Sequence, residues 1–246
     1  MRFLILSARK FKGYFLKLRL HGLLSWITGP ALSLFYLSRL SAWVRQIPRP
    51  ELNDFYVPDR NYERRYRLYE HLLKNHTQAS FNYLEFGVAR GVSFRWWLSN
   101  VPEPTCRFFG FDTFTGLPED WTLFKAGDMS ADGSFPDVGG DQRAVFLKGT
   151  FQETLPGFLD SFADDRQKIL HLDADIYTST LFVLTQFGTR LRKGDVLLFD
   201  EFNVPMHEFR AFLDFTSSYY IRLRLVAAVN NYYQAAFIVE ETPYQL

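Results

Sequence analysis

From residue 81 onward, short apolar runs alternate with stretches that repeat an apolar residue every three or four positions. The runs predict strands and the repeating stretches predict helices. Alternation of strand and helix indicates a parallel sheet with helices on both faces. The last two strands follow each other without a helix, which predicts an antiparallel edge. The predicted strands are 81–87, 107–114, 144–150, 168–176, 195–202, 221–229 and 232–240, and the helices among them are 93–101, 178–191 and 207–219.

The chain before residue 81 is organised differently. Residues 61–75 have helical spacing, whereas residues 45–60 are polar and rich in proline, which is typical of a linker. We therefore expect a helical arm with its linker over residues 1–55 and one folded domain over residues 56–246. Within this domain, residues 115–143 are rich in Gly, Asp and Pro and predict a long loop or lid.

Charge separates the arm from the domain. Residues 1–50 hold nine of the 28 Lys and Arg residues and none of the 27 Asp and Glu residues, so a basic arm precedes an acidic body. Apolar residues interleaved with Arg and Lys predict amphipathic helix, broken at Gly29-Pro30. The arm either packs on the body or a second subunit, lies on a membrane surface, or spans a membrane through the 18 uncharged residues from His21 to Ser38. We favour packing, because the break leaves two short helices.

Composition excludes some kinds of site. A hydrophobic content of 47% supports a substantial core and argues against disorder. Cys106 is the only cysteine, so neither an internal disulfide nor a cysteine-rich zinc site is possible. The basic N-terminal segment has no evident small-residue cleavage site, which disfavours a secretory signal peptide. We expect a reducing, cytoplasmic setting, with peripheral membrane contact as the alternative.

Two glycines mark the turn after the first of these strands. Gly87 and Gly91 in "YLEFGVARGVSF" let the chain turn sharply and let a ligand approach the start of the next helix. Their G-x-x-x-G spacing differs from the G-x-G-x-x-G of dinucleotide-binding oxidoreductases. Asp112 ends the second strand, where a carboxylate can accept both hydroxyls of a ribose. Alone, the glycines fit an ordinary turn equally well; with Asp112 they favour a nucleoside-bearing ligand.

Two pairs of acids end the fourth and fifth strands. Asp173 and Asp175 follow the fourth strand, and Asp200 and Glu201 follow the fifth. These strands are neighbours in a doubly wound sheet, so four carboxylates would meet at one edge. Buried like charges are costly unless they are paired or bind a metal. Oxygen ligands suit Mg²⁺, with Asp173, Asp200 and Glu201 as the natural trio. The alternative is that these acids cap helices and pair with arginines.

Nearby aromatic and histidine residues have simpler interpretations. His171, in the middle of the fourth strand, is expected to be a satisfied core histidine. His207 is expected to be a capping or substrate-loop residue. Trp121 is a candidate for a substrate cleft, whereas Trp96 and Trp97 are expected in the core.

Five motifs give the chain a family resemblance over about residues 80–246. It resembles class I S-adenosylmethionine-dependent methyltransferases and, more narrowly, the macrocin O-methyltransferase-like family of sugar O-methyltransferases. The resemblance implies an α/β fold, a doubly wound, mostly parallel, seven-stranded Rossmann-like sheet preceded here by the helical arm. The motifs are "YLEFGVARGVSFRWW", "FFGFDTFTGLPEDW", "VFLKGTFQETLPGFL", "HLDADIYTST" and "GDVLLFDEF…HEFRAF".

The same resemblance implies roles for individual residues. A metal site would take Asp173 from the fourth strand and Asp200 and Glu201 from the fifth, and Asp175 would be the general base. Glu201 departs from the family, in which two aspartates are common at this pair. The methionine part of the cofactor would lie at Glu85 to Gly91, the ribose at Asp112 and Phe114, and the adenine near Ser130 or Thr150–Phe151. Cofactor contacts are thus expected at Glu85, Gly87, Gly91, Ser93, Asp112, Phe114, Ser130 and Phe151.

The expected function is O-methylation. We expect transfer from S-adenosylmethionine, with Mg²⁺, to a hydroxyl of a sugar or glycosylated natural product. The alternatives are a catechol-like phenol as acceptor, and a non-catalytic binding protein that kept the fold. The expected partner is a small hydroxyl-bearing acceptor and not nucleic acid. A homo-oligomer and membrane-surface contact through the arm stay open.

Overall fold

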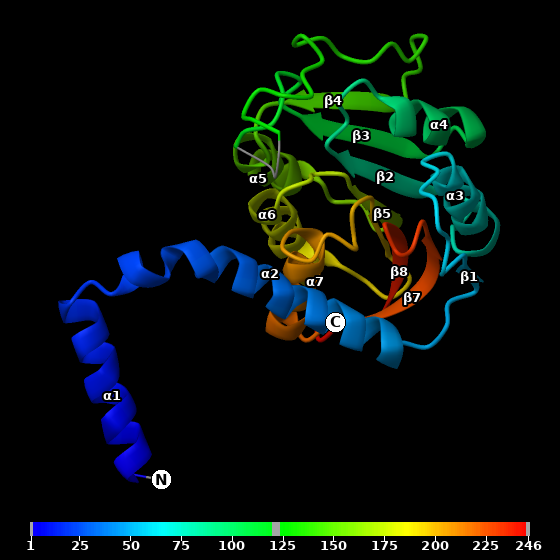
Figure 1. The fold of residues 1–246 in the computed structure, drawn as a ribbon. Helices are drawn as coiled ribbons and strands as arrows, with labels where there is room; N and C mark the ends of the chain where they lie inside the picture. The colour runs from blue at the N-terminus through cyan, green and yellow to red at the C-terminus, as the bar shows by residue number, and fades with distance from the viewer. Residues whose placement is uncertain (1, 120–123, 245–246) are drawn as a thin grey trace. The chain divides into compact units, whose positions relative to one another are not determined.

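Eight strands form one sheet in a computed structural model that describes residues 2–119 and 124–244 (Figure 1). The chain divides into two compact units, Met1–Arg45 and Gln46–Leu246. The arm-to-domain boundary expected near residue 55 stays a prediction. In chain order the elements are α1 (Arg2–Lys17), α2 (His21–Gln46), β1 (Leu52–Asn53), α3 (Arg64–Asn75), β2 (Phe81–Phe86), α4 (Val92–Asn100), β3 (Arg107–Asp112), β4 (Ala144–Lys148), α5 (Phe151–Ser161), β5 (Gln167–Leu172), α6 (Tyr177–Phe187), a 3-10 turn (Gly188–Arg190), β6 (Val196–Phe199), α7 (Glu208–Tyr219), β7 (Arg222–Val229) and β8 (Gln234–Glu241).

The strand order is β1-β7-β8-β6-β5-β2-β3-β4. Neighbouring strands in this order are parallel except for β8, which runs antiparallel to both β6 and β7. The predicted α/β, mostly parallel, doubly wound sheet is therefore confirmed. The predicted number of seven strands is wrong, because β1 adds an eighth strand alongside β7. The antiparallel strand also lies inside the sheet, between β6 and β7.

Helices cover both faces of the sheet (Figure 1). α3 and α4 lie on one face, and α5, α6 and α7 lie on the other. Alternation along β2 explains this arrangement, since successive side chains of a strand point to opposite faces. Tyr83 stacks on Trp97 of α4 with ring centroids 5.0 Å apart, whereas Phe86 meets Phe187 of α6 at 5.9 Å. Trp97 is thus a core residue, as expected.

The N-terminal unit consists of two helices joined by a sharp bend. The expected break at Gly29-Pro30 is wrong, because α2 continues through Pro30. Proline removes one backbone hydrogen bond, so it can bend a helix without ending it. The bend lies instead between Lys17 and His21, where Arg19 has a φ of 51°, and it measures 109°. Among the described helices none is by itself long and apolar enough to cross a membrane, but α1 from Leu6 and α2 pass that test together as a bent pair.

The segment expected to be a linker is built into the domain. We call residues 51–62 the strap. Its strand β1 pairs with β7, and the strap then follows the turn between β7 and β8. The Val57 N–H donates to Asn231 Oδ1 and the Asn231 side-chain amide donates to the Val57 carbonyl, both at 2.8 Å. The Asn61 N–H donates to Asn230 Oδ1 at 3.1 Å. These bonds join positions more than 160 residues apart, which a local sequence pattern does not reveal.

Helix α5 was not among the predicted helices. Its N-cap is Thr150, which forms a capping box with Glu153. The Glu153 carboxylate accepts from the Thr150 N–H at 2.8 Å. Thr-x-x-Glu directly after a strand is a recognised helix-start signal, so the sequence did contain the evidence for this helix.

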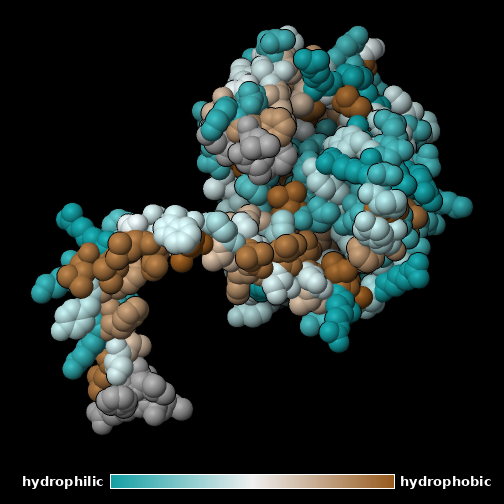
Figure 2. Space-filling view, in the orientation of Figure 1, coloured by the Kyte–Doolittle hydropathy of each residue, from teal (hydrophilic) through white to brown (hydrophobic). Residues whose placement is uncertain are grey.

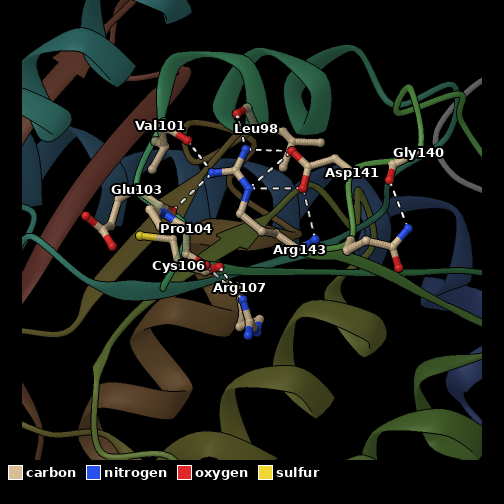
Figure 3. Close-up of polar contacts among 10 residues, drawn as sticks. Leu98, Val101, Glu103, Pro104, Cys106, Arg107, Gly140, Asp141 and Arg143 are labelled. Atoms are coloured by element: carbon tan, nitrogen blue, oxygen red, sulfur yellow. Dashed lines mark hydrogen bonds and ion pairs between the residues drawn. The ribbon is translucent and has the colours of Figure 1, made fainter.

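Arg143 fixes the end of the long loop that precedes β4 (Figure 3). Its guanidinium donates to Asp141 Oδ1 at 3.0 Å, to the Leu98 carbonyl at 3.1 Å and to the Glu103 carbonyl at 3.2 Å, and it also bonds the Val101 carbonyl. The hydrogen bond from Arg143 lowers the pKa of Asp141 below its ordinary value. This network ties the start of β4 to the segment after α4, so the end of the long loop is held at a fixed point.

Candidate active site

The carboxyl ends of β2, β5 and β6 meet at one edge of the sheet. β5 pairs with β2 on one side and with β6 on the other. Beyond the last paired residues, the Asp173 N–H donates to the Phe86 carbonyl at 2.9 Å and the Asp200 N–H donates to the Leu172 carbonyl at 3.0 Å. The backbone therefore places both acid pairs beside the Gly87 turn, where open α/β sheets bind ligands.

The two glycines of the turn are required by close packing. Gly87 has a φ of +98°, and a Cβ there would lie 1.7 Å from the Asp173 carbonyl oxygen. Gly91, the N-cap of α4, has a φ of +71°, and its Cβ would lie 2.5 Å from Pro136 Cβ. Gly87 thus lets the turn approach the end of β5, and Gly91 lets the long loop approach α4.

A cavity of about 680 Å³ opens beside this edge. That size falls within the range of small-molecule and cofactor sites. Its wall combines the Gly87 turn, the ends of β3 and β5, the long loop, the start of α5 and the strap. Gly91, Phe114 and Asp200 do not line it. The predicted site residues that do line it are Glu85, Gly87, Ser93, Asp112, Ser130, Phe151, Asp173, Asp175 and Glu201.

Asp112 connects two loops at the cavity. Its Oδ2 accepts from the Ala89 N–H at 2.7 Å and its Oδ1 from the Phe114 N–H at 2.6 Å. The Thr113 hydroxyl also lies 3.4 Å from Oδ1, but it donates at 2.8 Å to the Gly116 carbonyl. A carboxylate has about four acceptor positions, so up to two of them stay available for hydroxyl groups. The Phe114 side chain is buried and packs on Phe135, with ring centroids 5.0 Å apart. Its ring therefore does not line the cavity, and its contact with the ribose stays a prediction.

The four acids form two overlapping groups. Carboxylate oxygens of Asp173, Asp175 and Glu201 lie within 4.8 Å of one another, and so do ligand atoms of His171, Asp173 and Asp200. Asp173 belongs to both groups, so it lies close to both Asp200 and Glu201. Asp175, expected as a separate base, joins the first group, and its left-handed backbone (φ 58°) contributes to this placement.

Burial strongly perturbs the acids that face the cavity. It raises the pKa of Asp173 and of Glu201 well above the ordinary value. It also raises the pKa of Asp175 to about 7, with a further contribution from the charge of Asp200. Asp200 Oδ1 and Glu201 Oε2 are buried without a hydrogen-bond partner among the described residues. Hard oxygen donors that have no hydrogen-bond partner and lie close to further carboxylates fit a divalent cation such as Mg²⁺.

His171 is a buried neighbour of these acids. Its Nδ1 lies 2.7 Å from the Tyr83 hydroxyl, and its Nε2 lies 4.0 Å from Asp200 Oδ1. Burial lowers the pKa of His171, but the carboxylates of Asp200 and Glu85 outweigh it and raise the pKa to about 9. Burial likewise raises the pKa of Asp200, but His171 outweighs it, so that pKa is lowered. The acids around His171 thus favour its protonated form, which is more than the satisfied core histidine expected.

Three residues at the cavity were missed by the sequence reasoning. The Tyr62 hydroxyl donates to Asp200 Oδ2, and the Tyr233 hydroxyl donates to Glu201 Oε1 at 3.3 Å. The Arg60 guanidinium lies 3.6 Å from the centroid of the Tyr233 ring. Burial and the charges of nearby acids raise the pKa of Tyr62, so it stays a donor. Arg60 and Tyr62 come from the strap, whose sequence carries no motif.

The segment after β6 fixes Glu201. The buried Glu208 carboxylate accepts from the Glu201 N–H at 2.9 Å. His207 is the residue before α7, and its Nδ1 lies 3.3 Å from the Tyr177 N–H, in agreement with a capping role. Trp121, considered for the substrate cleft, lies outside the described residues.

Comparison with known proteins agrees with this geometry. Residues 84–202 match a family model described as a methyltransferase domain. No curated protein matches the sequence. The structure resembles the calicheamicin methyltransferase CalS11, with 21% identity over 83% of this chain and 91% of that chain, and a TM-score of 0.55. It also resembles the O-methyltransferase NovP, with 19% identity over 73% and 79% of the two chains, and a TM-score of 0.54.

A second CalS11 structure, described as a TDP-rhamnose 3'-O-methyltransferase, has 22% identity over 83% of this chain and 93% of that chain, with a TM-score of 0.50. Identities at this level show a shared fold. The family model confirms the resemblance to methyltransferases inferred from the five motifs, and the structural similarity confirms the Rossmann-like fold.

Proposed function

We propose, from the premise that residues 84–202 form a class I methyltransferase domain, that the protein is an S-adenosylmethionine-dependent and Mg²⁺-dependent O-methyltransferase. One observation carries the proposal. The half-buried carboxylates of Asp173 and Asp175 and the buried carboxylate of Glu201 converge at the wall of a cavity that also contains Gly87 and Asp112. The cavity therefore has acceptors for a nucleoside on one side and oxygen ligands for a cation on the other.

The cofactor would lie along the turn after β2. Gly87 leaves the backbone open at the cavity, and Glu85 offers a carboxylate for the ammonium group of the methionine part. The free acceptor positions of Asp112 suit the two ribose hydroxyls. Ser130 and Phe151 lie on the loop and helix that border the place for the adenine. When bound, S-adenosylmethionine supplies an activated methyl group on a sulfonium sulfur.

The cation would be held around Asp173. Asp200 Oδ1 and Glu201 Oε2 are among the buried oxygens without a hydrogen-bond partner in the described part of the chain, and each residue belongs to a group that contains Asp173. A bound Mg²⁺ would offset the charges of these acids and lower the pKa of an acceptor hydroxyl. Tyr62 and Tyr233 hold the outer oxygens of Asp200 and Glu201, which orients both carboxylates.

Asp175 would be the general base. Methyl transfer forms an oxygen–carbon bond and breaks the sulfur–carbon bond, so the acceptor hydroxyl must lose its proton. A base works best when its pKa is close to the working pH, and burial places the pKa of Asp175 at about 7. Asp175 lines the cavity and is therefore open to an acceptor.

We propose a sugar hydroxyl next to a second oxygen as the acceptor. A hard cation can orient two neighbouring oxygens, and both sugars and catechols provide such pairs. The similarity to CalS11, described as acting on TDP-rhamnose, supports a sugar over a catechol. Arg60, Arg65 and Arg90 at the cavity would also suit an acceptor that carries phosphate groups.

The proposal is tested by direct binding and by product analysis. Calorimetry should detect binding of S-adenosylmethionine to the full-length protein. The enzyme should then be incubated with the cofactor, Mg²⁺ and either TDP-rhamnose, other nucleotide sugars, methyl glycosides or catechol, and the products analysed by mass spectrometry. A methylated sugar that disappears with EDTA and in Asp175→Asn supports the proposal. Absence of cofactor binding, or full activity in EDTA, contradicts it.

A further inference from the structure

The N-terminal unit presents a basic, apolar surface. Residues 1–50 contain nine Lys and Arg residues and no acid, in a chain with nearly balanced charge. Figure 2 shows hydrophobic side chains along both helices of the arm, with hydrophilic groups between them. This combination is unusual for a segment whose only role is to join a core, because a core-packing helix needs no such excess of one charge.

Helix α1 has two chemically different sides. Ala8, Phe11 and Phe15 are spaced by three and four residues, and the rings of Phe11 and Phe15 lie 6.1 Å apart on one side. Lys10 and Lys17 fall on the opposite side by helical spacing. Phe11 is 68% exposed, so the described part of the arm itself does not cover this apolar side.

Helix α2 extends the surface beyond the bend. It carries no charged residue from Gly22 to Ser38, and among its exposed side chains are Leu23 and Trp26. Tryptophan prefers the boundary between lipid and water. A break at Gly29-Pro30 would favour packing of two short helices on the body, but α2 runs through that position without a break. The bend before His21 leaves α1 a separate amphipathic helix.

We propose that α1 and the first turns of α2 bind the surface of an anionic membrane. Charge complementarity selects this partner: the arm has cations and no acid, and an interfacial helix combines an apolar side with Lys and Arg. Phe11 and Phe15 enter the boundary region, and Lys10, Lys12 and Lys17 contact the lipid phosphates. The proposal concerns the arm alone and does not depend on methyl transfer.

Each cation near an anionic surface strengthens binding by about fivefold. Reversing three of them, in Lys10→Glu/Lys12→Glu/Lys17→Glu, should therefore weaken binding by at least about a hundredfold. Phe11→Ser should weaken it by about tenfold, because a large apolar side chain is then lost from the lipid boundary. All four positions are exposed on α1, so the folded domain should be unaffected.

The test is co-sedimentation of full-length protein with vesicles. One set contains phosphatidylcholine with phosphatidylserine, and the other contains phosphatidylcholine alone, each at about 0.1 M and about 1 M salt, where the screening length falls from about 10 Å to about 3 Å. The matched control is Lys74→Glu/Arg190→Glu/Lys193→Glu, which makes the same charge change at exposed positions of the domain.

The proposal predicts binding to anionic vesicles at low salt, release at high salt, and loss of binding in the arm variants but not in the control. Equal binding to neutral vesicles, or retention at high salt, would indicate a membrane span and overturn it. Absence of sedimentation with anionic vesicles would also overturn it and would favour an arm that packs on protein. Equal weakening by the domain control would show that the arm is not the binding surface.

Discussion

Replacement of Gly87 by alanine tests whether the turn after β2 really approaches the end of β5. The added Cβ would lie 1.7 Å from the Asp173 carbonyl oxygen, and Cβ atoms keep at least 3.0 Å from such neighbours. The backbone must therefore shift by more than about 1 Å, and the bond from the Asp173 N–H to the Phe86 carbonyl, at 2.9 Å, would be lost or stretched. Gly87 is thus the residue that sets the position of Asp173.

The loss in free energy of unfolding expected for Gly87→Ala has three parts. A left-handed backbone costs an alanine about 1–2 kcal/mol, overpacking costs about 1–3 kcal/mol, and one hydrogen bond is worth about 1 kcal/mol. Gly87→Ala should therefore lower the free energy of unfolding by about 3–6 kcal/mol. Gly194→Ala is the matched control, because Gly194 has a φ of +93° against +98° and has open space at its Cβ. The control should lose only the backbone part, about 1–2 kcal/mol.

The assay is urea denaturation of both variants, followed by measurement of Mg²⁺ binding at a temperature where both are folded. The Gly87→Ala variant should also bind Mg²⁺ more weakly, because the substitution displaces the Asp173 carboxylate. The Gly194→Ala variant should bind Mg²⁺ as the wild-type protein does. If the two variants lose the same stability, the close approach of the turn to β5 is refuted.

Three further predictions concern the charged groups. Asp112→Ala should weaken S-adenosylmethionine binding by at least about tenfold, since a hydrogen bond to a charged group is worth about 1.5–3 kcal/mol; an unchanged dissociation constant in a folded variant would remove the ribose assignment. Asp175→Asn should lower turnover by about 10²–10⁴ while Mg²⁺ binding persists, and equal loss of both would make Asp175 a ligand instead of the base. Burial raises the pKa of Asp175 from 3.8 to about 7, so without metal its contribution to stability is present below pH 4 and is lost as pH rises through 7. Urea denaturation in EDTA should follow this decline. A cation bound beside Asp175 favours its charged form, so saturating Mg²⁺ should stabilise the protein more at pH 8 than at pH 5. A pH-independent effect of Mg²⁺ would contradict a cation site beside Asp175.

The sequence predicted most of the sheet because its strands are continuous apolar runs that end in acids. Burial on both faces demands such runs, and the chemistry at strand ends demands the acids, so Asp112, Asp173 and Glu201 could be located without coordinates. Helix α5 could also have been found, because Thr150 and Glu153 form a recognisable capping box. Each of these features is set by residues that lie close together in the sequence, so a local pattern reveals it.

What could not be predicted depends on partners far away in the sequence. The strap has no motif, and its place is set by bonds such as that between Val57 and Asn231. Tyr62, which bonds Asp200, reaches the cavity only through that strap. The grouping of the four acids likewise depends on the left-handed backbone at Asp175, which no local pattern required.

The most direct test of the central claim is a titration of full-length protein with Mn²⁺, a spectroscopic substitute for Mg²⁺, followed by electron paramagnetic resonance. Our account predicts a site that Mg²⁺ displaces, that Asp173→Asn abolishes, and that Asp175→Asn keeps. Absence of bound Mn²⁺ in the wild-type protein, or equal binding by Asp173→Asn, would contradict the claim that the acids at the ends of β5 and β6 form a cation site.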